Sequence, residues 1–137
     1  TLLSDVVLAF ARVGLNQIKG YLKGGWESWK QAQLPISVTE EINPINLLKN
    51  EKFNVIDVRT LSEWNCGHIP RAKHIPCMEL SSRFSELPKE NLVFVCAGGY
   101  RSILAASLAE NAGCCRPGHI SGGMACWQSV GGSLITY

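Results

Sequence analysis

The fold can be derived from residues 92–102, LVFVCAGGYRS, because their pattern joins a buried strand to a helix through a short glycine loop. Residues 92–95 are apolar throughout, as in a central parallel strand that is covered on both faces. A helix is expected to follow from about Ser102 to Asn111 and to end at Gly113. Its expected buried side chains are Ile103, Leu104 and Leu108.

The alternation of strands and helices continues on the N-terminal side of this stretch. Residues 53–58, FNVIDV, form a second strand pattern. Asn43 and Pro44 supply an N-cap and a first-turn proline for one helix, and residues 60–63 have the spacing of a capping box for another. Alternating strands and helices predict an α/β fold with a mainly parallel sheet.

The loop after the strand carries the chemistry that the sequence suggests. Gly98 and Gly99 let the backbone curl so that successive N–H groups point inward, and the following helix adds the partial positive charge of its N-terminus. Cys96 lies at the bottom of this anion-binding bowl and Arg101 at its rim. We therefore expect Cys96 to have a lowered pKa and to be a reactive thiolate rather than an inert buried cysteine.

The length of the loop separates two chemistries. Cysteine phosphatases use a C-x5-R loop that usually follows a histidine, whereas here Val95 precedes Cys96 and four residues separate Cys96 from Arg101. A phosphatase also needs an acid for its alkoxide leaving group, while attack on a sulfane sulfur expels sulfite or a thiolate. The shorter bowl favours sulfur transfer over a phosphatase or an arsenate reductase.

Residues 36–137 resemble a rhodanese-type sulfurtransferase domain almost continuously. The resemblance rests on VIDVR (55–59), EW (63–64), GHIP (67–70), Ala72, IP (75–76), CAGGYRS (96–102), GG (122–123) and Trp127. It implies an α/β three-layer sandwich with a mostly parallel five-stranded central sheet and helices on both faces.

The resemblance also implies roles for the residues of the loop. Cys96 is expected to be the catalytic nucleophile, cycling between thiolate and persulfide, and Arg101 is expected to assist donor binding. The amides that hold the anionic persulfide are those of the substrate-binding loop, Ala97, Gly98, Gly99, Tyr100, Arg101 and Ser102.

Two function classes remain open after this resemblance. In the first, an enzyme moves sulfane sulfur from thiosulfate or a persulfide to cyanide, a thiol or a protein cysteine, with no metal or organic cofactor. In the second, the domain is a persulfide carrier that serves a fused or partner sulfur-metabolising enzyme. The expected partners are a small anionic sulfur donor and a thiol acceptor.

An internal repeat bears on the domain organisation. Residues 8–14, followed by Ile18, Gly24–Gly25 and Trp29, are echoed by residues 106–113, followed by Ile120, Gly122–Gly123 and Trp127. Residues 1–35 are therefore expected to be either the last helix–strand–helix of an upstream rhodanese-like domain or an N-terminal extension, and residues 36–137 a complete domain. The chain starts at Thr1, as a piece of a longer polypeptide would. The partial copy further resembles proteins with tandem rhodanese domains, including those that follow a metallo-β-lactamase-fold domain, which implies that residues 36–137 are the C-terminal copy.

Composition excludes several classes of protein and gives no support to several kinds of partner. The 137 residues are too few for a large multidomain enzyme, while 46% hydrophobic residues suffice for a core. A net charge of +2 without a basic run gives no reason to expect a nucleic-acid or membrane partner. The longest apolar stretch, residues 103–109, cannot span a bilayer. Six irregularly spaced cysteines indicate free thiols and a cytoplasmic location.

Several other polar and sulfur-containing residues are candidates for a salt bridge, a metal site or core packing. Asp57 and Arg59 are expected to form a structural salt bridge that braces the neighbouring loop, with Glu63 as a further partner. A zinc site is disfavoured, because its histidines fall in a turn and a strand; its candidate ligands are Cys66, His68, His74 and Cys77. Packing or no assigned role is expected for the remaining candidates, Cys114, Cys115, Cys126, Trp26, Trp29 and Trp127.

Overall fold

The computed structural model describes residues 3–12, 17–114 and 116–136. The chain divides between Ser37 and Val38 into two compact units. The larger unit, residues 38–137, holds the sheet and the Cys96 loop, and the smaller one is described separately below.

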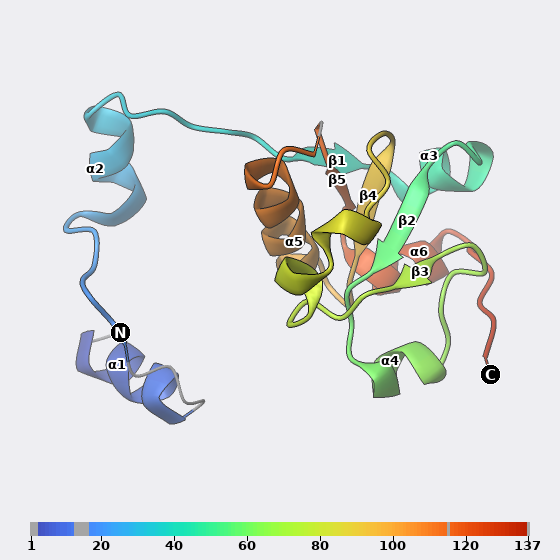
Figure 1. Cartoon of the computed structure of the whole chain (residues 1–137), viewed down its shortest axis with the longest axis horizontal. Coiled ribbons are helices and arrows are strands. Elements are labelled where there is room, and N and C mark those ends of the chain that lie inside the picture. The colour runs from blue at the N-terminus through green and yellow to red at the C-terminus, as the bar shows by residue number, and fades with distance from the viewer. Residues whose placement is uncertain (1–2, 13–16, 115, 137) are drawn as a thin grey trace. The chain divides into compact units, whose positions relative to one another are not determined.

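A five-stranded sheet forms the centre of the larger unit (Figure 1). Every pair of neighbouring strands is parallel, so the prediction of an α/β fold on a parallel sheet is confirmed. The spatial order of the strands is β1 (Glu40–Ile42), β5 (Gly118–Ile120), β4 (Leu92–Val95), β2 (Asn54–Asp57) and β3 (Lys73–His74). β4 lies at the middle and all four of its residues are buried, as its unbroken apolar run predicts.

Helices cover the two faces of this sheet and make three layers. Helix α5 (Tyr100–Asn111) packs on β4 and β5, over a cluster that contains Ile56 and Phe94. The opposite face buries Val55 and Val93 against α3 (Pro44–Lys49) and α6 (Gly123–Ser129). Alternate residues of each strand thus feed alternate layers. The shorter elements are α4 (Leu61–Asn65), η1 (Leu80–Ser82) and η2 (Phe84–Glu86).

Both predicted helix starts are present. The Asn43 side chain accepts a hydrogen bond from the backbone N–H of Ile45 at 2.9 Å, and Pro44 opens α3. At α4, the Thr60 hydroxyl accepts from the N–H of Glu63, and the Glu63 carboxylate accepts from the N–H of Thr60 at 2.9 Å. This reciprocal capping box holds the Glu63 side chain at the start of α4.

The predicted buried side of α5 is wrong. Ile103 and Leu104 are 44% and 52% exposed, and Leu108 is only half-buried. Because Ser102 is fully buried beside Cys96, the helix is phased so that the residues on the same side as Ser102 face the sheet. Those residues are small enough for a close approach to the strands; they are Ala105, Ala106 and Ala109.

The smaller unit holds two helices, α1 (Leu3–Arg12) and α2 (Gly25–Gln31). None of its described residues, 3–12 and 17–37, belongs to a strand. The strand expected between the two helices falls partly on residues 13–16, which lie outside the described residues, so the expected remnant stays a prediction. Trp26 is 55% exposed rather than packed in a core. The Trp29 indole N–H donates to the carbonyl of Pro35 at 3.0 Å, a local contact that turns the chain after α2.

Candidate active site

The Cys96 loop joins the carboxyl end of β4 to the start of α5. Gly99 takes φ +114°, a conformation that side-chain-bearing residues rarely adopt, and the helix begins at the next residue, Tyr100. Ala97, Gly98 and Tyr100 are exposed at the rim, whereas Gly99 and Ser102 are buried. Such a crevice beyond the carboxyl ends of the strands is the usual ligand position in open parallel sheets.

Two backbone N–H donors and one hydroxyl group surround the sulfur of Cys96. The backbone N–H groups of Gly99 and Ser102 lie 3.1 and 3.4 Å from Sγ, and the Ser102 hydroxyl oxygen lies 3.5 Å away. The residue is 2% exposed. Burial by itself raises the pKa of the Cys96 thiol, but the hydrogen bonds from the Ser102 side chain, from the Ser102 and Gly99 amides and from the Gly98 amide outweigh it and lower the pKa.

The Ser102 hydroxyl has one hydrogen and two neighbours that can accept it. Its oxygen lies 2.8 Å from the carbonyl oxygen of Gly99 and 3.5 Å from Cys96 Sγ. With a neutral thiol, the hydroxyl donates to Gly99 and the thiol donates to the hydroxyl. A hydroxyl at this distance can donate a hydrogen bond to a Cys96 thiolate only by turning its hydrogen away from the Gly99 carbonyl.

The loop is clamped from the opposite face of the sheet by the start of α6. The backbone N–H groups of Met124 and Ala125 donate to the carbonyls of Cys96 and Ala97 at 2.8 and 3.3 Å. Gly123 has φ +58°, and a Cβ there would overlap both carbonyl oxygens. The Gly122–Gly123 pair of the family motif therefore has a steric role at the site that the sequence alone does not disclose.

Arg101 forms a bidentate ion pair with Glu63. Nη1 and Nη2 each lie 2.7 Å from a carboxylate oxygen, and the two side chains are 36% and 32% exposed. The pairing with Arg101 holds the pKa of Glu63 well below its usual range, and burial opposes this only in part. The expectation that Glu63 supports Asp57 and Arg59 is corrected, because its partner is the arginine of the loop.

Asp57 and Arg59 form the salt bridge that the sequence predicts. Arg59 Nη2 lies 2.7 Å from a carboxylate oxygen of Asp57, and Nε lies 3.0 Å from both oxygens. The same Nη2 donates to the carbonyl of Gly67 at 2.8 Å. The pair is buried and ties the end of β2 to the turn after α4, so it braces the segment that carries Glu63.

The candidate zinc ligands serve other contacts. His68 and His74 both stack on the indole of Trp64, with ring centroids 3.4 and 4.8 Å from it. His68 Nδ1 lies 3.1 Å from the carbonyl of Trp64, and His74 Nε2 lies 2.9 Å from the carbonyl of Arg59. Within the described ranges, no group of three or more His, Cys, Asp or Glu gathers at metal-binding distance.

The remaining cysteines and Trp127 take different positions. Trp127 is buried in the cluster on the α3 and α6 face, as predicted. Cys126 and Cys114 are half-buried, and Cys114 packs against the cluster beneath α5. Cys115 lies outside the described residues. Cys77 was considered only as a metal ligand, but it lies close to the loop, with Sγ 4.0 Å from the carbonyl oxygen of Arg101.

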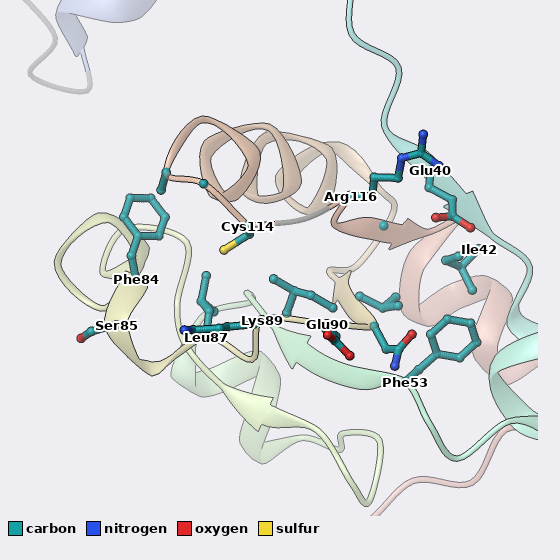
Figure 2. A pocket seen from close by; sticks show the side chains of 16 residues that line it. Glu40, Ile42, Phe53, Phe84, Ser85, Leu87, Lys89, Glu90, Cys114 and Arg116 are labelled. Carbon is teal, nitrogen blue, oxygen red and sulfur yellow. The ribbon is translucent and has the colours of Figure 1, made fainter.

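Hollows lie at both ends of the sheet. A cavity of about 830 Å³ opens at the amino ends of the strands, between Glu40, Phe53, Phe84 and Cys114 (Figure 2). A smaller one of about 220 Å³ borders the loop at Gly98 and Gly99. Because parallel strands place their carboxyl ends at the same edge, only the smaller hollow adjoins the Cys96 loop.

No helix in the described part of the chain is long and apolar enough to cross a bilayer.

Residues 45–130 match the family model described as the Rhodanese-like domain. A Bacillus subtilis protein named "Putative sulfur carrier protein YrkF" is 30% identical over 106 residues, which cover 77% of this chain and 57% of that protein. An Allochromatium vinosum protein named "Sulfurtransferase" is 33% identical over 90 residues, which cover 65% of this chain and 84% of that protein. This chain thus spans little more than half the length of the first relative and most of the second.

Solved structures share the same fold. The crystal structure of a rhodanese-related protein from Thermoplasma volcanium superposes with a TM-score of 0.66 at 28% identity, covering 72% of this chain and 99% of that one. A rhodanese-like domain protein from Staphylococcus aureus gives a TM-score of 0.60 at 29% identity, with 72% and 99% covered. The expected rhodanese-like sandwich is therefore confirmed for the larger unit.

Proposed function

Because the chain belongs to the family of rhodanese-like domains, we propose that it is a sulfurtransferase that carries sulfane sulfur as a persulfide on Cys96. The observation that carries this proposal is the set of donors around Sγ: two backbone N–H groups at 3.1 and 3.4 Å and the Ser102 hydroxyl at 3.5 Å. Donors fixed around a buried sulfur stabilise negative charge on it. Both the attacking thiolate and the persulfide anion need that stabilisation.

The first half-reaction balances without a cofactor. The Cys96 thiolate attacks the outer sulfur of thiosulfate, a new S–S bond forms, and sulfite leaves with the electron pair of the old one. The product is the Cys96 persulfide anion, whose charge stays within reach of the same N–H groups. An acceptor thiolate or cyanide then attacks the outer sulfur and returns Cys96 as thiolate.

Arg101 is proposed to bind the sulfonate end of the donor from the rim of the bowl. Its two terminal nitrogens already hold Glu63, so the ion pair fixes the guanidinium plane. A guanidinium carries five N–H groups, and those not used by Glu63 remain for an anion. The side chain is 36% exposed, which supports its contact with a small donor from solvent.

A carrier function is the second candidate, and the name of the Bacillus subtilis relative favours it. A carrier would load and hold the persulfide at Cys96 yet turn over small thiols slowly. We also propose a cytoplasmic location, because the five cysteines that the structure describes are free thiols, as a reducing compartment maintains them. Residues 1–35, as a remnant or an extension, are proposed to lie outside the chemistry.

Loading with thiosulfate tests the proposal directly. The protein is mixed with thiosulfate, sulfite release is followed, and the modified cysteine is located by peptide mass spectrometry after alkylation. We expect stoichiometric sulfite release with one extra sulfur on Cys96, and none in Cys96→Ser, because a hydroxyl stays protonated at neutral pH. Cys126→Ser, a half-buried thiol on α6, is the matched control. Sulfite release that survives in Cys96→Ser would refute the assignment.

The second step separates enzyme from carrier. After loading, the persulfidated protein is desalted and mixed with cyanide or a small thiol. Repeated turnover with these small acceptors supports the enzyme. The carrier is supported if small acceptors leave the persulfide intact and a protein thiol removes its outer sulfur.

A further inference from the structure

The hollow of about 220 Å³ that borders the Cys96 loop is a candidate binding site. The loop contributes Gly98 and Gly99 to its wall. Gly99 is buried, yet a Cβ there would meet no atom within 4 Å, so open space lies beside its backbone. The backbone nitrogen of the same residue lies 3.1 Å from Cys96 Sγ. One residue of the loop therefore borders the hollow and contacts the reacting sulfur.

Two polar side chains from neighbouring strands line the hollow on the side of the sheet. Glu41 belongs to β1 and His119 to β5. The two residues are register partners in the parallel pairing of these strands, so their side chains leave the same face of the sheet next to each other. Glu41 is exposed and gives the hollow a carboxylate. The hollow thus combines a negative charge with an imidazole ring.

The hydrogen bonding of His119 is incomplete. The residue is 6% exposed, and its Nδ1 is buried without a hydrogen-bond partner in the part of the chain that the structure describes. Buried polar atoms in proteins are almost always paired, because an unpaired one lowers stability. A half-turn of the ring about its Cβ–Cγ bond exchanges Nδ1 with a carbon, so the nitrogen can face the side that supplies a partner. A polar group bound in the hollow would supply that partner.

The chemistry of the two side chains favours an ammonium group as the ligand. A carboxylate accepts hydrogen bonds, and a neutral imidazole with its hydrogen on Nε2 accepts at Nδ1. An ammonium group donates three hydrogen bonds, so it can serve both Glu41 and His119, and its charge complements the carboxylate. An anionic group would be repelled by Glu41. On the α5 side, Tyr100 and Ile103 complete the wall with side chains that suit methylene groups.

We propose that this hollow is the subsite for the sulfur acceptor, and that it holds the ammonium group of a small thiol while the thiol attacks the Cys96 persulfide. This inference rests on the proposed persulfide at Cys96. Because Gly99 borders the hollow and contacts Sγ, a thiol only a few bonds from its ammonium group connects the two places. Glu41 and His119 are thus binding residues that determine which acceptor is used.

The transfer to such an acceptor balances with no oxidant or reductant. The proton of the acceptor thiol passes to the outer sulfur of the Cys96 persulfide anion, and the resulting thiolate attacks that same sulfur. A new S–S bond forms on the acceptor, the bond to Cys96 breaks, and Cys96 leaves as a thiolate beside the N–H groups of Gly99 and Ser102. The acceptor departs as a small persulfide.

Discharge of the loaded protein by three thiols of similar size tests the proposal. The protein is loaded with thiosulfate, desalted and mixed with cysteamine, 2-mercaptoethanol or 3-mercaptopropionate, which end in an ammonium, a hydroxyl and a carboxylate. The loss of the extra sulfur from Cys96 is followed by mass spectrometry. Each rate in a variant is divided by the wild-type rate for the same thiol, so that the intrinsic reactivity of the thiol cancels.

Glu41→Gln should change the selectivity among these thiols. We expect discharge by cysteamine to fall roughly fivefold, discharge by 2-mercaptoethanol to stay unchanged and discharge by 3-mercaptopropionate to rise. Glu40→Gln is the matched control, because Glu40 is the exposed neighbour on β1 and lines the cavity at the other end of the sheet. It should leave all three rates as in the wild type.

His119→Phe keeps a ring in place and removes both nitrogens. Discharge by cysteamine should fall roughly tenfold while loading from thiosulfate stays unchanged. His119→Asn, which keeps a hydrogen-bond acceptor, should recover part of the lost rate. If the His119 variants fail to fold, the exposed Glu41 still decides the question.

Several outcomes would overturn the acceptor subsite without touching the proposed function. One is a cysteamine rate that Glu41→Gln leaves unchanged, and another is an equal change for all three thiols, which would indicate a merely structural effect. A wild-type persulfide that none of the thiols discharges would also overturn it, although Cys96 would still carry the sulfur. Failure of thiosulfate to place a sulfur on Cys96 would instead refute the proposed function.

Discussion

Two loops at the carboxyl edge of the sheet each carry an arginine paired with a carboxylate, and the two pairs differ in burial. After β2, the Arg59 and Asp57 side chains are 9% and 0% exposed. Arg101, in the first turn of the helix that follows β4, is 36% exposed, and its partner Glu63, on α4, is 32% exposed. A buried pair is costly to break because it leaves a bare charge in the interior, whereas a half-exposed pair is screened by solvent. The first pair is therefore expected to contribute more to stability, and the second leaves its arginine partly exposed to solvent.

The largest effect is expected on breaking the buried pair. Arg59→Met removes the guanidinium from the Gly67 carbonyl and from the Asp57 carboxylate, which keeps only the backbone N–H of residue 59 among these donors, and should lower the free energy of unfolding by about 3 to 5 kcal/mol. Urea unfolding followed by fluorescence measures this.

The double variant Asp57→Asn with Arg59→Met is the matched control. It removes the stranded charge, so it should be more stable than Arg59→Met alone. A loss below about 1 kcal/mol in Arg59→Met would contradict the role assigned to the buried pair.

A smaller effect, on donor use rather than on stability, is expected at the exposed pair. If Arg101 holds the donor sulfonate, Arg101→Ala loses a charge-assisted hydrogen bond of about 1.5 to 3 kcal/mol and should lower kcat/KM for thiosulfate roughly ten- to a hundredfold. Loading from glutathione persulfide, which has no sulfonate, should fall less.

Arg83→Ala provides the control for a lost surface ion pair, since Arg83 pairs with Glu79 and Glu86 away from the loop. Near-unchanged loading by both donors in Arg101→Ala would remove this arginine from donor binding. The backbone amides would then be the anion site.

Ser102→Ala should change the pH dependence of loading. The variant loses the side-chain hydrogen bond that helps to lower the pKa of Cys96, so the thiolate should form at higher pH. A lowered pKa extends the thiolate to lower pH, and loading is lost as the pH falls through that pKa. The acidic limb of the loading rate should therefore move to higher pH in the variant, whereas Ser129→Ala, an exposed serine on α6, should not move it. Coincident profiles would show that the backbone amides suffice.

The smallest effect is expected on removing residues 1–37. The Cys96 loop, both arginine pairs and each strand found among the described residues lie in residues 38–136, so thiosulfate loading should stay near that of the full chain. Self-association is measured alongside by analytical ultracentrifugation, because the removed unit exposes apolar side chains such as Trp26. Loss of loading in a truncated protein that keeps its native circular dichroism would show that the smaller unit contributes to the site.

Local sequence patterns predict the structure correctly where a few neighbouring residues decide it. The apolar run of β4, the Asn43 cap and the Thr60–Glu63 capping box all appear as predicted. The predicted buried side of α5 is wrong, because the hydrophobic pattern favours Ile103 and Leu104, and both are exposed. Ser102 faces Cys96 in the loop, and this contact sets the rotation of the helix about its axis. The contact is made with the site, so the hydrophobic pattern of the helix alone does not predict it.

The sequence alone predicts the α/β alternation, the family, and a cysteine at the base of a glycine loop before a helix, because each is carried by motifs whose residues are neighbours in the chain. Only the tertiary structure decided that Arg101 pairs with Glu63, 38 residues away, that Gly123 closes on the Cys96 carbonyl, and that Cys77 lies near the loop. These contacts depend on the order of the strands in the sheet, which brings distant loops to one edge. The hydrophobic periodicity of a sequence does not predict the order of the strands in the sheet.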